Sequence, residues 1–204
     1  MRKTKEEAEI TKQNLLAAGL KVFSQKGYKA TRVNDIAKQA NVTTGAIYHH
    51  FRGKSEIFIA LVEKSEAKAN QLAQNILDEG GTPATILRQL VVRVFQFIEE
   101  DEEYRAMYDL FLNKAEFSSK LSSLIKQSLE GRRQLARYFS DLIKKGIKMG
   151  EFRPDVSPDD TALALVGFMH GIGLIWVQDP EHFSIKKRAK NLVDQFLRGI
   201  VIGG

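Results

Sequence analysis

Residues 41–54, NVTTGAIYHHFRGK, bring together side chains that could bind a polyanion. Two threonines, a glycine and an alanine stand ahead of Tyr48 and His49, and basic residues follow. Hydroxyl groups and the amides at a helix N-terminus donate hydrogen bonds to phosphate. A small methyl group can contact thymine, and a threonine hydroxyl can bind either type of base. The segment therefore has the groups needed to contact nucleic acid, provided that a helix presents them.

The positive charge of the chain is concentrated in its first quarter. The 204 residues carry a formal net charge of +6. Residues 1–54 hold 11 basic and 4 acidic side chains, whereas the remaining residues hold 20 basic and 21 acidic ones. Such one-sided basicity indicates a polyanionic partner. On charge alone, a solvated basic surface explains the same distribution.

The composition argues against an enzyme and against a metal or organic cofactor. The absence of cysteine excludes disulfides, thiol nucleophiles and cysteine-ligated zinc. The sequence has no glycine-rich phosphate loop or nucleophile motif, and its four histidines are not spaced as metal ligands. Hydrophobic residues make up 43% of the chain, enough for a substantial core. The charged N-terminus lacks the apolar run of a signal peptide, so we expect a cytoplasmic protein.

Apolar residues recur at helical spacing throughout, and no alternating pattern indicates a strand. The first helix is predicted to end at Gly27, two short helices follow, and a longer one runs from near Lys54 to before Gly80. Further helices are predicted to start at Pro83 and Pro158, because a hydroxyl residue that can cap a helix precedes each proline.

The remaining boundaries come from charge and proline. The acidic run at residues 99–103 is predicted to separate two helices, and a long helix is expected from about residue 119 to residue 149. Asp179-Pro180 ends the next helix, and a last one extends to Ile200. The pattern predicts an all-α fold of about nine helices.

Residues 33–51 have the pattern of two short helices joined by a tight turn. Asn41 stands at the turn, where a residue that tolerates positive φ is needed, and Thr43 can cap the second helix. This is the layout of a helix-turn-helix motif, whose second helix enters the major groove of DNA. A helix pair that merely packs would show the same pattern. The apolar positions that can form its small core are Ile36, Ala37, Ala40, Val42, Ile47 and Phe51.

Residues 15–58 strongly resemble the DNA-binding domain of the TetR/AcrR family of bacterial transcription regulators. Residues 146–162, GIKMGEFRPDVSPDDTA, resemble the family's approach to its penultimate helix. The resemblance implies a three-helix, helix-turn-helix DNA-binding domain over residues 1–54 and a larger helical domain for ligand binding and dimerisation over residues 55–204. The matching positions in the first domain are Phe23, Gly27, Tyr28, Thr31, Ile36, Ala37, Ala40, Val42, Gly45, Ile47, Tyr48, Phe51 and Lys54.

The resemblance implies that the third helix lies in the major groove of operator DNA. Thr43, Thr44 and Tyr48 match positions that commonly contact phosphates or bases, and Lys54 matches a phosphate contact. His49 is the longest polar side chain on the outward face, so we expect it to contact a base or phosphate; the alternative is a merely solvated histidine. The predicted DNA-binding residues are Thr31, Arg32, Thr43, Thr44, Gly45, Ala46, Tyr48, His49 and Lys54.

Two departures from the family pattern affect this prediction. The family usually has Ser or Thr at position 32 as a helix cap, and this chain has Arg32. Arginine has no acceptor oxygen, so we expect Thr31 to cap the second helix together with Asn34, which leaves Arg32 to reach DNA. Position 44 is often Arg, Lys or Ser in relatives, whereas Thr44 cannot make the bidentate contact of arginine with guanine. The operator of a relative therefore cannot be transferred to this chain.

Residues 161–177, TALALVGFMHGIGLIWV, are the most apolar run of the chain. The run is at the lower limit for a membrane span, but it contains His170 and glycines and has acids at both ends. A helix that is apolar all round is buried on several sides, so we expect one side to face the core and another to face a second subunit. The resemblance implies a homodimer formed by the last two helices. The predicted interface residues are Gly167, Gly171, Leu192 and Phe196.

The resemblance also implies a ligand pocket in the C-terminal domain. Apolar pockets with a few polar groups are typical of small-molecule sites. Aromatic residues at helical spacing also occur in ordinary cores, and that alternative stays open. The predicted ligand-binding residues are Tyr104, Met107, Tyr108, Phe111, Phe168, His170 and Trp176.

The resulting hypothesis is a dimeric repressor that a small apolar effector releases from a palindromic operator. Effector binding would swing the fourth helix and change the separation of the two DNA-binding helices. The expected partners are double-stranded DNA, a second copy of the chain and the effector, without a membrane. The alternative is a helical adaptor or membrane-surface protein that lacks sequence-specific DNA binding.

Overall fold

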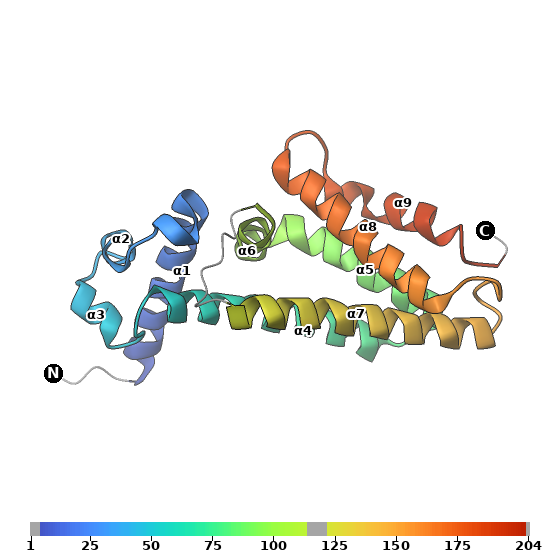
Figure 1. Ribbon diagram of the computed structural model, residues 1–204, viewed down its shortest axis with the longest axis horizontal. Coiled ribbons are helices and arrows are strands. Elements are labelled where there is room, and N and C mark those ends of the chain that lie inside the picture. Colours follow the sequence, from blue (N-terminus) through green and yellow to red (C-terminus); the bar gives the residue numbers. More distant parts are fainter. Residues whose placement is uncertain (1–4, 114–121, 203–204) are drawn as a thin grey trace. The chain divides into compact units, whose positions relative to one another are not determined.

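The computed structural model describes residues 5–113 and 122–202, which form nine helices (Figure 1). Apart from one antiparallel bridge between Phe152 and Val201, these described ranges contain no strand. The predicted all-α fold is confirmed, and the helix start expected near residue 119 lies outside the described residues. The helices are α1 (Lys5–Ala30), α2 (Val33–Gln39), α3 (Thr44–Tyr48), α4 (Lys54–Glu79), α5 (Pro83–Glu100), α6 (Glu102–Asn113), α7 (Ser122–Lys148), α8 (Pro158–Gln178) and α9 (Ile185–Leu197).

The contacts within the chain divide it into two units. The first comprises Met1–Ala67 and Ala106–Ile125, and the second comprises Lys68–Arg105 and Lys126–Gly204. This division differs from the predicted one at residue 54 because the first part of α4 shares the core of the helix-turn-helix unit. α6 also supplies residues to the first unit, which no local pattern in the sequence indicated.

In the first unit, an aromatic cluster joins α1 to α4. The ring centroids of Phe23, Tyr28 and Phe58 lie 5.1–5.7 Å apart. α1 and α4 approach each other closely at Gly19, where a Cβ atom would lie 2.7 Å from Cγ2 of Ile57. α2 packs on α1, and α3 packs on α2 (Figure 1). The short helices that follow α1 are therefore held by a core to which both long helices contribute.

Side-chain caps fix the starts of two helices in the second unit. The hydroxyl of Thr82 accepts a hydrogen bond from the amide of Thr85, and the hydroxyl of Ser157 accepts one from the amide of Asp160, each at 3.4 Å. Proline follows each cap in the first helical turn. Both helix starts predicted from proline are confirmed.

The acidic run at residues 99–103 interrupts the helices less than predicted. α5 continues to Glu100, and Asp101 alone separates it from α6. The Asp101 carboxylate accepts a hydrogen bond from the amide of Tyr104 at 2.8 Å and pairs with the Lys68 ammonium group at 2.7 Å. A cap and a counter-ion together offset the repulsion among neighbouring acids.

α5, α8 and α9 pack together in the second unit (Figure 1). The Glu99 carboxylate of α5 holds the start of α9 by accepting from the Ser184 hydroxyl at 2.9 Å and from the Lys186 amide at 2.9 Å. At the end of α8, the indole N–H of Trp176 donates to the carbonyl of Phe183 at 2.9 Å. These bonds place a negative charge at the positive end of α9 and satisfy the buried indole.

The corner after α7 depends on glycine. Gly150 ends the helix with a φ of 74°, in the left-handed region that glycine adopts without strain. The chain then turns back, and the fully buried ring of Phe152 rests directly on Gly146 of α7, where a Cβ atom would overlap the ring. The Arg153 amide donates to the carbonyl of Ile200 at 2.8 Å, so Ile200 bonds to the corner and does not extend α9. α9 therefore ends at Leu197, earlier than predicted.

We expect Gly146→Ala to lower the free energy of unfolding by about 1–3 kcal/mol, because the added methyl group overpacks the Phe152 ring. Gly131→Ala in the same helix is the matched control, since nothing lies within 4 Å of its added Cβ atom. The control should stabilise the protein by about 0.5–1 kcal/mol through helix propensity. Denaturant unfolding of both variants measures the difference, and equal effects would contradict the close contact.

Candidate nucleic-acid interface

α2 and α3 are joined by a turn of the predicted kind. Asn41 has a φ of 55°, and it follows Ala40, whose amide donates to the carbonyl of Ile36 at 2.9 Å. The Val42 amide then donates to the carbonyl of Ala37 at 3.0 Å, which closes the end of α2. The prediction of positive φ at Asn41 is confirmed. Asparagine tolerates this conformation better than most residues other than glycine.

α3 presents one face to the core and another to solvent. Thr43 caps the helix, as predicted, because its hydroxyl accepts a hydrogen bond from the Ala46 amide at 3.2 Å. Ile47 is fully buried, whereas the neighbouring Tyr48 is 57% exposed. The structure thus brings most of the predicted DNA-binding residues to one short helix: Thr43, Gly45, Tyr48 and His49 are exposed, and Thr44 and Ala46 are half-buried.

The cap of α2 differs from the predicted one. Thr31 does not cap the helix: its side chain is 1% exposed, and its hydroxyl donates to the carbonyl of Gly27 at 2.7 Å. Arg32 is the N-cap residue, and the Asp35 carboxylate accepts from the Arg32 amide at 2.9 Å. Half of a capping box therefore replaces the missing cap oxygen. The exposed Arg32 side chain is left available to a ligand, but the buried Thr31 hydroxyl is not.

Asp35 also forms an ion pair with Lys26 of α1, with a distance of 2.9 Å between their charged atoms. The hydrogen bond from Lys26, followed by that from the Arg32 amide, lowers the pKa of Asp35 below its ordinary value. The carboxylate therefore stays ionised and keeps the start of α2 attached to α1. Asp35 therefore links the backbone amide of Arg32 to the side chain of Lys26 in α1.

The ammonium group of Lys54 binds other groups of the protein and is not free at the surface. Its ammonium group donates hydrogen bonds to the carbonyl oxygens of Tyr28, Lys29 and Thr31, at 2.7–3.0 Å. An ammonium group has only three N–H donors. The predicted phosphate contact by this side chain would therefore break at least one of these bonds.

The outward face of α8 is an apolar stripe of small and aliphatic residues. Leu163 is 66% exposed and Ile175 is 57% exposed, and Gly167 and Gly171 lie exposed between them. By length and composition α8 could cross a membrane, but the core helix of a soluble protein passes the same test. Within the chain, 33% of the most apolar window of α8 is buried. On α9, the predicted interface residues Leu192 and Phe196 are half-buried.

The predicted ligand-binding residues fall in both units. Met107, Tyr108 and Phe111 belong to the first unit, where Met107 is 2% exposed within the core and Phe111 packs against it. Tyr104, Phe168, His170 and Trp176 belong to the second. Here the Phe168 ring lies between those of Phe95 and Phe196, at centroid distances of 5.9 and 5.2 Å, and Tyr104 packs on Phe97 at 4.9 Å.

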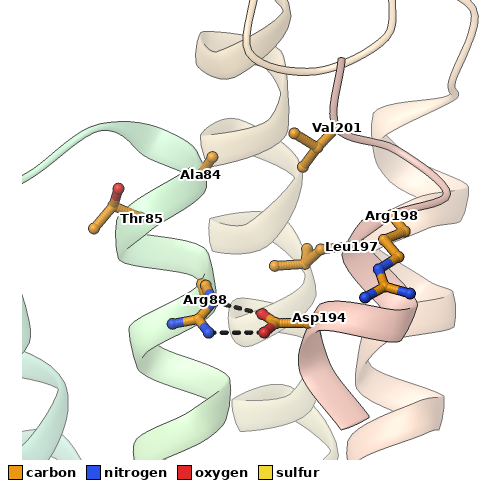
Figure 2. Close-up of a pocket in the computed structure, with 7 residues that line it drawn as sticks. All are labelled: Ala84, Thr85, Arg88, Asp194, Leu197, Arg198 and Val201. Atoms are coloured by element: carbon orange, nitrogen blue, oxygen red, sulfur yellow. Dashed lines mark hydrogen bonds and ion pairs between the residues drawn. The ribbon is translucent and has the colours of Figure 1, made fainter. Parts of the chain in front are cut away.

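A surface hollow of about 350 Å³ lies between the start of α5 and the end of α9. Figure 2 shows the bidentate pair that crosses it, in which the Arg88 guanidinium donates to the Asp194 carboxylate at 2.6 and 2.9 Å. Hydrogen bonding to Arg88 lowers the pKa of Asp194, so the pair persists well below neutral pH. None of the predicted ligand-binding residues lines this hollow, which is formed by Ala84, Thr85, Arg88, Asp194, Leu197, Arg198 and Val201.

Gln89 of α5 is not among the residues predicted for a ligand site. Its Oε1 atom is buried and has no hydrogen-bond partner in the described part of the chain. Buried amide oxygens usually have such a partner, so an unpaired one requires an explanation. A glutamine within a helix carries no signal that distinguishes it from a surface residue, and burial alone reveals it.

His170 is held neutral in α8. Its Nδ1 lies 2.9 Å from the carbonyl of Val166, which fits a neutral ring that donates from this nitrogen. Burial lowers the pKa of His170 below its ordinary value, and the nearby charge of Arg132 adds to this effect. The folded protein therefore favours the neutral imidazole more than the unfolded chain does.

We expect His170 to destabilise the protein in acid. Because its pKa is lower in the folded state, its contribution is fully present above about pH 6.5, its ordinary pKa, and is lost as the pH falls further. The loss is limited to about 1.4 kcal/mol per pH unit. Thermal unfolding of the protein and of His170→Gln between about pH 7.5 and pH 5.5 measures it. Identical pH dependence of the two proteins would contradict this assignment.

Together, the helix pair and its tight turn define a helix-turn-helix protein. Comparison with known proteins agrees. Residues 15–61 match the family model of bacterial regulatory proteins of the tetR family, and residues 82–201 match that of the C-terminal region of MAATS-type transcriptional repressors. The chain belongs to the TetR/AcrR family of transcriptional regulators. It is a transcriptional repressor of the helix-turn-helix class and not an enzyme.

The chain is similar to several regulators over nearly its whole length. It is 31% identical to the HTH-type transcriptional regulator AcrR of Shigella flexneri, over 94% of this chain and 90% of that protein. The structure of NalD, the secondary repressor of the MexAB-OprM multidrug efflux pump in Pseudomonas aeruginosa, matches with a TM-score of 0.84 at 24% identity, over 98% of this chain and 100% of NalD. The complex of Stenotrophomonas maltophilia SmeT with triclosan matches with a TM-score of 0.79 at 25% identity, over 96% of this chain and 93% of SmeT.

Proposed function

We propose that this repressor acts as a homodimer that binds a palindromic operator through α3 and is released by a small apolar effector. The observation that carries the DNA-binding part is the exposed face of α3, where Tyr48 and His49 project beside the buried Ile47. Because Ile47 anchors α3 in the core, Tyr48 and His49 are free to present a hydroxyl and an imidazole to phosphates or bases.

The residues of this face differ in the contacts they can make. Thr44 and His49 have polar groups that can reach base edges, and Ala46 can contact a thymine methyl group. Thr43, Tyr48 and Arg32 supply hydroxyl and guanidinium donors for phosphate. Gly45 has no side chain, so it allows the backbone of α3 to approach the groove closely.

The proposed dimer is supported by the apolar stripe on α8. A stripe that includes Leu163 and Ile175 at more than half exposure is costly in water and is suited to a second copy of itself. Gly167 and Gly171 between them permit close approach of two helices, and Leu192 and Phe196 of α9 extend the surface. The second subunit, and not a membrane, then covers α8, which agrees with a cytoplasmic DNA-binding protein.

The proposed effector is apolar with at least one hydrogen-bond donor. Phe168 and Trp176 supply aromatic surface in the second unit, with Tyr104 and His170 as polar neighbours on the same or adjacent helices. Gln89 of α5, in the same unit, has a buried Oε1 atom that could accept such a donor. Triclosan in the SmeT complex is a ligand that a similar protein binds. Coupling between effector and DNA is expected to be about 1–3 kcal/mol.

The DNA-binding proposal is tested by selecting bound duplexes from random sequences with the full-length protein. We expect an enriched palindrome whose half-sites are about 34–36 Å apart. Thr44→Ala or His49→Ala should relax the preference at one base position, worth about 1–3 kcal/mol. Arg32→Gln should weaken binding to all sequences and reduce the slope of log affinity against log salt by about 0.9.

Lys148→Gln is the matched control, because it removes one positive charge from the exposed end of α7 in the other unit. The control should leave both sequence preference and slope unchanged. Binding that is salt-sensitive but blind to sequence would favour the adaptor or membrane-surface alternative, as would retention on anionic vesicles without retention on any duplex.

The dimer proposal is tested by Gly171→Arg. A Cβ atom at Gly171 meets nothing within 4 Å inside the chain, so the subunit should fold normally while a charge enters the proposed interface. We expect monomers in sedimentation and at least 100-fold weaker operator binding, because two half-sites no longer bind together. Gly131→Arg places the same side chain on another open helical glycine and should remain dimeric. A dimeric Gly171→Arg protein would refute this interface.

A further inference from the structure

The ammonium group of Lys54 binds the end of α1. Its three acceptors are the carbonyl oxygens of Tyr28 at 2.8 Å, Lys29 at 3.0 Å and Thr31 at 2.7 Å. The last carbonyls of a helix have no partner within the helix, and they form the negative end of its dipole. Lys54 therefore supplies both the missing hydrogen bonds and a compensating positive charge.

The segment that Lys54 binds follows an interruption of α1. At Gly27 the backbone leaves helical geometry, with a φ of 74°. The Thr31 hydroxyl donates to the carbonyl of Gly27 at 2.7 Å, which ties off a further acceptor of the same segment. Between them, Thr31 and Lys54 bind the carbonyl oxygens of four residues of this segment: Gly27, Tyr28, Lys29 and Thr31.

Tyr28 holds the ammonium group from a second direction. The centroid of its ring lies 4.6 Å from Nζ of Lys54, a distance suited to a cation–π contact. The ring itself is 4% exposed and packs against Phe23 and Phe58, so its position is fixed by the core. The ammonium group of the half-buried Lys54 is thus contacted by three carbonyl oxygens and by an aromatic face.

We propose that Lys54 is a positioning residue that fastens the first turn of α4 to the end of α1 and so fixes how α2 and α3 are presented to DNA. α2 begins at Val33, directly after the bound segment, so a displacement of the start of α4 must pull on the entry to the helix-turn-helix. The inference rests on the proposed DNA binding by α3. It replaces the phosphate contact predicted for this lysine.

Two variants separate positioning from phosphate contact. Lys54→Gln removes the charge, and Lys54→Arg keeps it in a planar group that cannot donate to the three carbonyls as a single ammonium group does. We expect both to bind operator about 10-fold or more weakly, with the salt slope of the Gln variant unchanged. Rescue by arginine, or a slope reduced by about 0.9 in the Gln variant, would show a phosphate contact and overturn the proposal.

Labelling of the unmodified protein provides a test that does not depend on a folded variant. Acetic anhydride reacts with exposed lysine amines, and mass spectrometry measures the rate at each site. We expect Lys54 to react at least 10-fold more slowly than the exposed Lys148, because its amine is engaged in three hydrogen bonds. Rapid labelling of Lys54 in the free protein would overturn the proposal.

Selection of DNA sequences and the labelling rate of Lys54 test the proposed function and the positioning role separately. If the protein selects no DNA sequence, the proposed function fails, and the labelling rate in free protein still decides whether Lys54 is engaged. If the protein binds its operator and Lys54 labels rapidly until DNA protects it, DNA binding stands and the positioning role fails.

Discussion

A helix of five residues such as α3 is not stable on its own, so the proposed DNA-binding surface exists only because the core of the first unit holds it. Ile47 is the anchor within the helix, and Phe51 follows it into the same core. The Thr43 cap satisfies one amide, but most of the stabilisation comes from burial against α1 and α4. Within α3, Gly45 and Tyr48 are exposed to solvent, and Thr44 and Ala46 are half-buried.

In the second unit, the main constraint is apolar surface that the chain does not bury. α8 carries more apolar surface than the chain itself buries, since Leu163 and Ile175 remain exposed on one side while Leu165 and Trp176 are buried on the other. The ion pair between Arg88 and Asp194 holds α5 to α9. This packing does not cover the outward stripe of α8, where Leu163 and Ile175 stay exposed. A chain whose subunit is complete except for one apolar stripe is suited to self-association, and two-fold symmetry would double its DNA-binding helices.

The elements that were predictable from sequence depend on local chemistry. The starts of α5 and α8 follow from a cap and a proline, and the turn at Asn41 follows from its tolerance of positive φ. The cap of α2 was predicted wrongly, because Arg32 contributes only its amide and the acceptor is supplied by Asp35. The role of Lys54 could not be read from its neighbours, since its carbonyl partners lie 23 to 26 residues earlier in the chain.

Non-local packing also explains the remaining differences. The predicted boundary at residue 54 follows the helix-turn-helix pattern, but a long helix can serve two cores. α4 supplies Ile57 and Phe58 to the first and continues beyond Ala67 into the second. The prediction that Met107 and Phe111 line a ligand site came from the family resemblance, and helical spacing left an ordinary core as the alternative. In the structure, both pack with the first core.

The continuity of α4 gives a physical basis for the proposed response to an effector. An effector can change DNA affinity only if it has different affinities for two conformations. α4 is covalently continuous between the two units, and Lys54 at its first residue is bonded to the segment that leads into α2. A change in the second unit that shifts α4 along or about its axis would strain short hydrogen bonds to fixed carbonyl oxygens. The helix-turn-helix would then have to move with α4 or lose those bonds, and either outcome alters how α3 meets the groove.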